Sequence, residues 1–310
     1  MFTNRWWIYQ RERFPLLAHA PLVAAFSFSA LCFSSLLRDD VSMPGLLPSM
    51  VAFLTALLLF LQLRIADEFK DYDEDCRYRA YRPVPRGLVS LRELGWVAVA
   101  SMLVQLVLAL LLAPSLVLLL VLVWLYLALM SKEFFVHDWL KARPLTYMWS
   151  HMLIMPLIDL YATACDWWMV GEGLGEGLPS GLYWFLLVSF FNGVVIEVGR
   201  KIRAPQDEEE GVETYTVLWG AQRAVVFWLA ALGLTAVCAL MAAWQIGFYI
   251  PVAILLTVLL TIALLTGRSF MKDRQTKIAK RFELISGIWT LLMYLSLGAM
   301  PMLWSVWSVS

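Results

Sequence analysis

The chain has 310 residues, of which 61% are hydrophobic and only 15% are charged, and its mean hydropathy is +0.72. A soluble domain of this length could not hide so much apolar surface, so the composition excludes an ordinary soluble protein and predicts an integral membrane protein. The 24 basic and 24 acidic residues balance to a net charge of zero, which gives no reason to expect nucleic-acid binding.

Nine apolar stretches are each long enough to cross a bilayer as a helix, which takes about 20 residues and satisfies every backbone hydrogen bond in lipid. In chain order they cover residues 15–37, 46–64, 94–113, 115–131, 145–165, 181–199, 222–243, 247–266 and 284–306. The first stretch has no small-residue cleavage site after a short apolar core, so we expect a true span and not a signal peptide. We therefore predict an all-α integral membrane protein with about nine transmembrane helices, in which residues 1–310 form a single domain.

The basic residues alternate between the connections in a way that predicts the orientation of the chain, because cytoplasmic loops collect Lys and Arg. If the N-terminus is cytoplasmic, the connections on that side hold 23 of the 24 basic residues, and only Arg38 lies on the other side. A wrong number of spans would scramble this alternation. The pattern predicts a multi-pass protein with a cytoplasmic N-terminus and a C-terminus on the opposite side of the membrane.

The connection after the second stretch carries three aspartates at helical spacing: Asp67, Asp71 and Asp75. On a helix that continues from the span, residues four apart lie along one face, so the three carboxylates would stack there. Like charges at this spacing destabilise a helix, so the stack needs a compensating cation or exposure to water. Carboxylate oxygens suit Mg²⁺, which keeps several waters and bridges protein carboxylates to substrate phosphates.

Arginines flank this acidic run, with Arg64 before it and Arg79 and Arg82 after it. Guanidinium groups bind phosphate oxygens as a fork, so the segment combines a candidate metal site with a candidate cradle for a diphosphate. The alternative is a solvated loop whose charges pair with one another and with anionic lipid head groups.

A second mixed-charge segment follows the sixth stretch and begins with Glu197 at the end of an apolar helix. An ionisable group in such a helix is costly in lipid and marks a functional candidate. Arg200 and Lys201, three and four residues later, are placed to serve the site or simply to pair with Glu197, and both interpretations remain open. Arg203 adds a third cation before Pro205 ends the helix.

The two mixed-charge segments follow even-numbered spans, lie on the same face of the membrane and are four spans apart. Two four-helix halves would each present one charged helix end to a shared central cavity that opens to the cytoplasmic face. A pair of facing segments is harder to explain as solvated surface than a single one.

At these residues the chain resembles the UbiA superfamily of intramembrane prenyltransferases. Members of that family have nine helices and two Asp-rich motifs, after helices two and six, that bind an isoprenyl diphosphate through Mg²⁺. The first motif, NxxxDxxxD, is matched with Asp in place of Asn by Asp67, Asp71 and Asp75. The RPxxxG that follows the first motif, and the GxxT with a further Gly that follows the second, are matched by Arg82, Pro83, Gly87, Gly211, Thr214 and Gly220.

The second motif departs from the family pattern of three aspartates, because Glu197 is followed by Arg200, Lys201 and Arg203. The resemblance carries Asp207 over as a metal ligand by its distance of four residues from Gly211, and Glu197 by its general place on the sixth helix. Basic residues in place of metal ligands imply either that one Mg²⁺ is lost and its charge supplied by Lys and Arg, or that the substrate differs.

Lys132, after the fourth span, lies where the family often has a Lys that contacts the diphosphate. A Lys at this end of a helix is also a common anchor at the membrane surface, and that alternative stays open.

The resemblance implies a Mg²⁺-dependent enzyme in which the metal is held by Asp67, Asp71, Asp75 and Asp207, with Glu197 as a further catalytic residue. The diphosphate would be bound by Arg64, Arg79, Arg82, Lys132, Arg200, Lys201 and Arg203. The enzyme would ionise an isoprenyl diphosphate and transfer the prenyl group to a lipophilic, aromatic acceptor within the lipid bilayer. Two alternatives remain: a terpene cyclase on the same scaffold, which needs no acceptor, and a nonenzymatic transporter or lipid-binding protein.

Overall fold

The computed structural model describes residues 4–170 and 178–309, and all the regular secondary structure within these residues is helical. The longer helices are α2 (Leu16–Leu37), α3 (Leu46–Lys70), α5 (Leu91–Leu112), α6 (Leu116–Ser131), α9 (Ile154–Trp167), α10 (Leu182–Arg200), α12 (Ala221–Gln245), α13 (Tyr249–Lys272), α14 (Thr276–Leu297) and α15 (Ala299–Val309). The shorter ones are α1 (Arg5–Arg13), α4 (Tyr72–Tyr78), α7 (His137–Lys141), α8 (Pro144–Met152) and α11 (Tyr215–Trp219), with 3-10 turns η1 (Glu133–Phe135), η2 (Trp168–Val170) and η3 (Pro205–Asp207). The predicted all-α membrane class is therefore confirmed.

Seven candidate spans in the described part of the chain are long and apolar enough to cross a membrane, with α14 and most of α15 counted as one. The two other predicted spans correspond to α6, which has 16 residues, and to the pair α8 and α9. The pair is interrupted at Leu153 because Pro156 lacks an amide hydrogen and its ring clashes with the carbonyl four residues earlier. The count of nine therefore stays a prediction, as does the central cavity.

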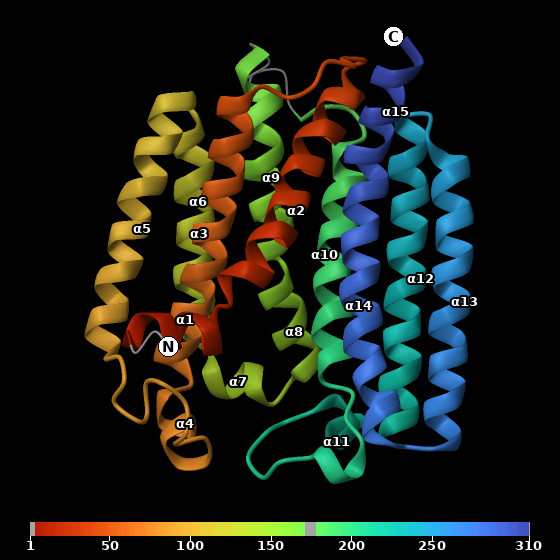
Figure 1. Ribbon diagram of the computed structural model, residues 1–310. Helices are drawn as coiled ribbons and strands as arrows, with labels where there is room; N and C mark the ends of the chain where they lie inside the picture. The colour runs from red at the N-terminus through yellow and green to blue at the C-terminus, as the bar shows by residue number, and fades with distance from the viewer. Residues whose placement is uncertain (1–3, 171–177, 310) are drawn as a thin grey trace.

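The long helices run roughly parallel in a bundle, with α5 and α13 at its two outer edges (Figure 1). In the middle, α10 packs against α12, α14, α9 and α8, while α2 packs against α9, α3 and α14. Of the candidate spans, α10, α14, α12 and α2 are the most buried, and the outer helices α5 and α13 present apolar side chains outward, as helices in lipid do. The core therefore lies where α2, α9, α10 and α14 meet.

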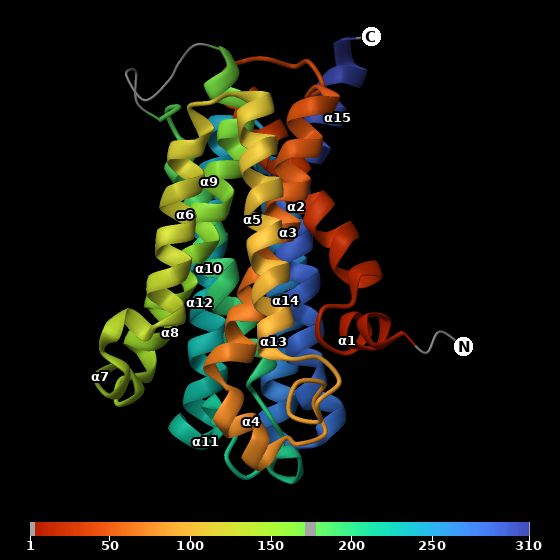
Figure 2. The ribbon, with the colours of Figure 1, turned by 90° about the vertical axis from the view of Figure 1, so that its left-hand side faces the viewer.

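The short helices α4, α7 and α11 gather at one end of the bundle, and the C-terminus lies at the opposite end (Figure 1). Helix α1 lies against the flank of the bundle near the same end as α4 (Figure 2). Its Tyr9 is buried beside Ile65, Val84 and Val89, and its last residue, Arg13, forms an ion pair with the buried Glu68 on α3. We call the end that carries α4, α7 and α11 the charged end; that it faces the cytoplasm remains the prediction from the basic residues.

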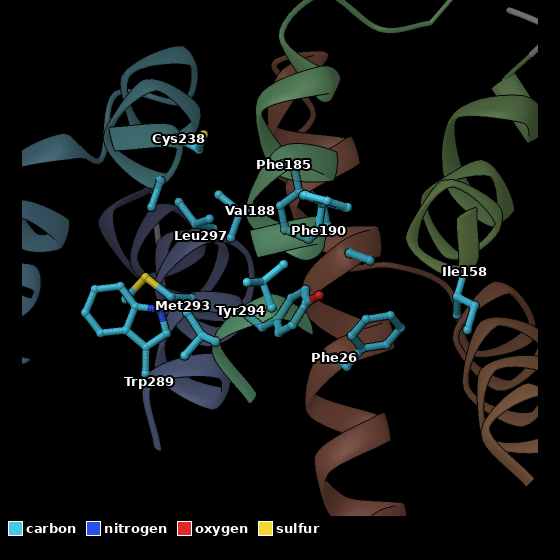
Figure 3. Close-up of a cluster of buried hydrophobic side chains, with 14 of the residues drawn as sticks. Phe26, Ile158, Phe185, Val188, Phe190, Cys238, Trp289, Met293, Tyr294 and Leu297 are labelled. Carbon is cyan, nitrogen blue, oxygen red and sulfur yellow. The ribbon is translucent and has the colours of Figure 1, made fainter. Parts of the chain in front are cut away.

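Tyr294 lies in the apolar interior of the bundle, among buried hydrophobic side chains from several of the central helices (Figure 3). Tyr294 on α14 packs edge-on against Phe26 of α2 and Phe185 of α10. Its hydroxyl lies 2.8 Å from Oδ2 of Asp159 on α9 and 3.1 Å from Oγ of Ser189 on α10. A buried carboxyl without hydrogen bonds would be costly in this environment, so these bonds fix the relative positions of α9, α10 and α14 above the charged end.

Candidate active site

The first mixed-charge segment keeps its helical register past the end of α3. Helix α3 ends at Lys70 and α4 begins at Tyr72, with Asp71 between them. The amide of Asp71 donates to the carbonyl of Asp67 at 2.9 Å, and the amide of Asp75 donates to the carbonyl of Asp71 at 2.8 Å. The predicted spacing of four residues along one helical path is thus confirmed for the backbone.

Asp67 and Asp71 carry negative charge that nearby basic groups only partly balance. Both side chains are half-buried, and Asp67 has one ion pair, to Arg64 at 3.4 Å. Burial raises the pKa of the Asp71 carboxyl above its usual range, and the charges of Asp67, Asp75 and Glu74 raise it further, against the opposing effect of Lys70. A cation at this helix end would relieve that repulsion.

Asp75 is engaged differently from its two neighbours. Its buried carboxylate accepts two hydrogen bonds from Arg82, at 2.6 and 2.9 Å, and forms an ion pair with Arg79 at 3.2 Å. These contacts close the turn after α4 and neutralise the charge of Asp75. Three residues that the sequence predicts as ligands of the metal or the diphosphate therefore form a cluster in which both arginines bond to Asp75. Asp75 as a metal ligand, and Arg79 and Arg82 as diphosphate ligands, stay predictions.

The second mixed-charge segment places two cations on one carboxylate. Nε of Arg200 donates to Oε2 of Glu197 at 2.7 Å, and Nζ of Lys201 lies 2.9 Å from Oε1. The Lys201 ammonium also lies 5.5 Å from the ring centre of Tyr215, the first residue of α11. The amide of Tyr215 donates to the carbonyl of Lys201 at 3.1 Å, which holds α11 beneath the end of α10.

The two mixed-charge segments meet at the charged end of the bundle. The charges of Asp67 on α3 and Arg200 on α10 interact with each other. Gly211 packs on α4: a Cβ atom there would lie 2.8 Å from the ring of Tyr78, and its φ of +75° is one that other residues adopt at a cost. The loop that follows α10 therefore contacts α4, which follows α3, and the cavity that the two helix ends would share stays a prediction.

The remaining residues of the second segment bond within their own loop or to α14. Asp207 accepts a hydrogen bond from Thr276 at 3.0 Å, and Arg203 pairs with Glu209 at 3.2 Å. Glu208 accepts from the hydroxyls of Thr214 and Thr216, at distances between 2.7 and 2.9 Å. Within residues 4–170 and 178–309, no three His, Cys, Asp or Glu side chains lie together so as to hold a metal by themselves. The ligand set of Asp67, Asp71, Asp75 and Asp207 thus stays a prediction, and the structure brings together its first two members.

A hydrogen-bonded network beside these aspartates was not singled out by the sequence. Nζ of Lys70 donates to the hydroxyl of Tyr147 on α8 at 2.7 Å, and that hydroxyl lies 3.3 Å from Oε1 of the buried Glu133. The ring of Tyr147 stacks on His151 with ring centres 4.0 Å apart. Lys70 stands directly before Asp71, which is the one signal that pointed to it. Lys132 is exposed at the end of α6, and its neighbour Glu133 joins the network instead.

Comparison with known proteins identifies the family of the chain. The family model described as the UbiA prenyltransferase family matches residues 42–297. No curated protein matches the chain.

Several solved structures share the fold, among them the following three. The first is the apo structure of a UbiA homolog from Aeropyrum pernix K1, which is 16% identical over 90% of this chain and 97% of its own, with a TM-score of 0.66. A digeranylgeranylglyceryl phosphate synthase is 14% identical over 95% of this chain and 99% of its own, with a TM-score of 0.61. A UbiA homolog from Archaeoglobus fulgidus bound to DMAPP and Mg²⁺ is 15% identical over 93% of this chain and 98% of its own, with a TM-score of 0.53.

Proposed function

Because the chain belongs to the UbiA prenyltransferase family and is an intramembrane prenyltransferase, we propose that it uses Mg²⁺ to ionise an isoprenyl diphosphate and transfers the prenyl group to a lipophilic, aromatic acceptor. The observation that carries the proposal is a pair of carboxylates at the end of α3: Asp67, whose charge interacts with that of Arg200 at the end of α10, and Asp71, which directly follows the helix. UbiA homologs of the same fold bound to DMAPP or to GPP, each with Mg²⁺, support the choice of donor and metal.

The residues at the end of α3 suit Mg²⁺ that is shared with a substrate better than a metal ion that is held by protein ligands alone. Mg²⁺ is commonly held by one or two carboxylates together with substrate phosphates and several waters. Asp67 and Asp71 would supply those carboxylates, and the raised pKa of Asp71 reflects negative charge that a divalent ion would balance. When bound, the ion would stabilise the charge that develops on the leaving diphosphate.

The basic groups of the chain would hold the diphosphate and complete its neutralisation. Arg64 lies beside Asp67, and Arg200 and Lys201 approach from α10. As the allylic C–O bond breaks, its electron pair stays on the diphosphate oxygen, and fixed cations around that oxygen lower the barrier.

The resulting carbocation needs a dry and electron-rich environment. The stacked rings of Tyr147 and His151 border the aspartates, and the faces of aromatic rings attract cations. Lys70 holds Tyr147 in place through its hydroxyl. The acceptor then forms a bond to the cation and loses one proton, and the apolar bundle keeps water from competing with it.

We expect metal binding to weaken on acidification at a higher pH than an ordinary aspartate pair would show. The pKa of Asp71 is raised, so a proton competes with Mg²⁺ for this carboxylate above the usual titration range of Asp. Calorimetric titration of Mg²⁺ into the protein in nanodiscs, repeated between about pH 5 and pH 8, should show the apparent affinity falling as pH falls. In the variant Asp71→Asn the remaining affinity should lose most of this dependence; an unchanged pH profile would remove Asp71 from the metal site.

The proposed reaction is tested by measuring diphosphate release from isoprenyl diphosphates of several chain lengths, with purified protein in lipid nanodiscs. Each donor is incubated with and without Mg²⁺, and with and without a pool of lipophilic aromatic acceptors. Release that requires both Mg²⁺ and an acceptor, together with a prenylated product, is the expected result. Acceptor-free release with a hydrocarbon product would identify a terpene cyclase instead, and no release from folded protein would favour a nonenzymatic lipid-binding or transport role.

A further inference from the structure

Two basic side chains at the end of α10 share a single carboxylate. Arg200 bonds to one oxygen of Glu197 through Nε and Nη2, and Lys201 bonds to the other oxygen. The side chains of Arg200 and Lys201 are 51% and 32% exposed, whereas that of Glu197 is 13% exposed. The cations are therefore accessible from the charged end, while the carboxylate that they hold lies behind them, and the cluster has an excess of one positive charge.

Stabilisation of the helix does not account for this arrangement. Ion pairs three or four residues apart on a helix contribute little to its stability. Here the pair also faces groups from two other elements: Arg200 interacts with Asp67 of α3, and Lys201 lies over Tyr215 of α11. The two cations thus point to the same place as the aspartates at the end of α3.

The geometry points to a diphosphate subsite that needs no metal: we propose that Arg200 and Lys201 bind a diphosphate directly, and that Glu197 is an internal anion which the diphosphate displaces. The guanidinium fork of Arg and the point charge of Lys, now bonded to a carboxylate, match the oxygens of a phosphate equally well. A diphosphate offers more oxygens and more charge than Glu197, so it competes successfully for both cations.

This inference rests on the proposed function for the identity of the ligand, and it makes the site asymmetric. The α3 side supplies carboxylates for Mg²⁺, and the α10 side supplies fixed positive charge for the same diphosphate. Glu197 then competes with the diphosphate for Arg200 and Lys201. Removing its charge should strengthen diphosphate binding, whereas removing the charge of a metal ligand would weaken it.

The experiment measures binding of inorganic pyrophosphate, and of an unreactive isoprenyl thiolodiphosphate, to the full-length protein in nanodiscs with EDTA present. Glu197→Gln should bind about tenfold more tightly than the wild type, and the double variant Arg200→Gln with Lys201→Gln should bind at least about tenfold more weakly, as expected for charge-assisted hydrogen bonds. The matched control is Glu12→Gln, which removes one carboxylate from an ion pair with Arg86, 3.1 Å long, on α1; its affinity should equal that of the wild type. Thermal unfolding of each variant shows whether it is folded.

The proposed subsite is contradicted if Glu197→Gln binds the diphosphate no more tightly than the wild type, or if Glu12→Gln gains affinity to the same extent. It is also contradicted if folded wild type and Glu197→Gln bind diphosphate only when Mg²⁺ is added, a result that leaves the proposed function intact. Absence of binding by folded protein with and without Mg²⁺ would contradict the proposed function itself.

Discussion

Replacing Asp71 with asparagine should lower turnover of an isoprenyl diphosphate by about a hundredfold or more, the loss typical of removing one group that stabilises developing charge. The variant should nevertheless be at least as stable as the wild type. The pKa of Asp71 is raised in the folded protein, so its ionised form opposes folding, and the stability that its protonated form contributes is lost as pH rises through the folded pKa. An amide at this position is neutral at every pH and removes that penalty.

The measurement is diphosphate release at saturating Mg²⁺, paired with thermal unfolding of the same preparation. Asp73→Asn is the matched control, because Asp73 is an exposed acidic residue on α4 and the same charge is removed. Its turnover should stay close to that of the wild type. Equal losses in the two variants would mean that net charge, and not the carboxylate of Asp71, matters at this helix end.

Replacing Asp75 with asparagine should lower the stability of the protein more than its affinity for Mg²⁺. The carboxylate is 2% exposed and bonded to both Arg79 and Arg82, and removing one partner of a buried ion pair costs about 3 kcal/mol or more. Two guanidinium groups would then be left without their shared anion, and the turn from Arg79 to Gly87 would loosen. The apparent melting temperature of the protein in detergent should fall clearly below that of the wild type.

At temperatures where the Asp75→Asn variant is still folded, calorimetry should show that it keeps most of the Mg²⁺ affinity of the wild type. This outcome separates a residue that supports the site from one that binds the metal. A variant that is as stable as the wild type but has lost Mg²⁺ binding would return Asp75 to the ligand set that the sequence predicts.

The spans and the first acidic segment could be predicted because both depend on local properties of the chain. A long apolar run forms a helix in lipid wherever it stands, and residues four apart on a continuing helix stay on one path. The backbone bonds from Asp71 to Asp67 and from Asp75 to Asp71 follow from this rule. The sequence could not show that Asp75 bonds to Arg79 and Arg82, since the direction of a side chain depends on which loop folds back against it.

In the second mixed-charge segment, the sequence predicted which residues match the family pattern but not what those residues contact. The match at Gly211 and Thr214 is correct as a pattern, but the structure gives these residues structural tasks. Gly211 allows the loop to touch Tyr78, and Thr214 caps α11 by accepting from the amide of Val217 while its hydroxyl bonds to Glu208. The resemblance implies Asp207 by its distance from Gly211, and that distance does not reveal the hydrogen bond, 3.0 Å long, from Thr276 of α14 to Asp207. Contacts between residues far apart in the chain decide such cases.

The hydrogen bond between Lys70 and Tyr147 could not be predicted for the same reason. The two residues are separated by 77 positions, and their hydrogen bond exists only because the end of α3 and the start of α8 lie close together at the charged end. A lysine within an acidic run is most simply explained as a local counter-charge, and a tyrosine at the start of a span as part of an aromatic belt. The fold brings these two residues together beside Asp71 at the charged end.

A structure of the protein in nanodiscs with Mg²⁺ and an unreactive isoprenyl thiolodiphosphate tests the central claim most directly. We expect a metal ion bonded to the carboxylates of Asp67 and Asp71, and a diphosphate that bridges this ion to Arg200 and Lys201, with the isoprenyl chain extending into the bundle. A metal ion bound away from both aspartates, or a diphosphate held elsewhere in the molecule, would contradict the account.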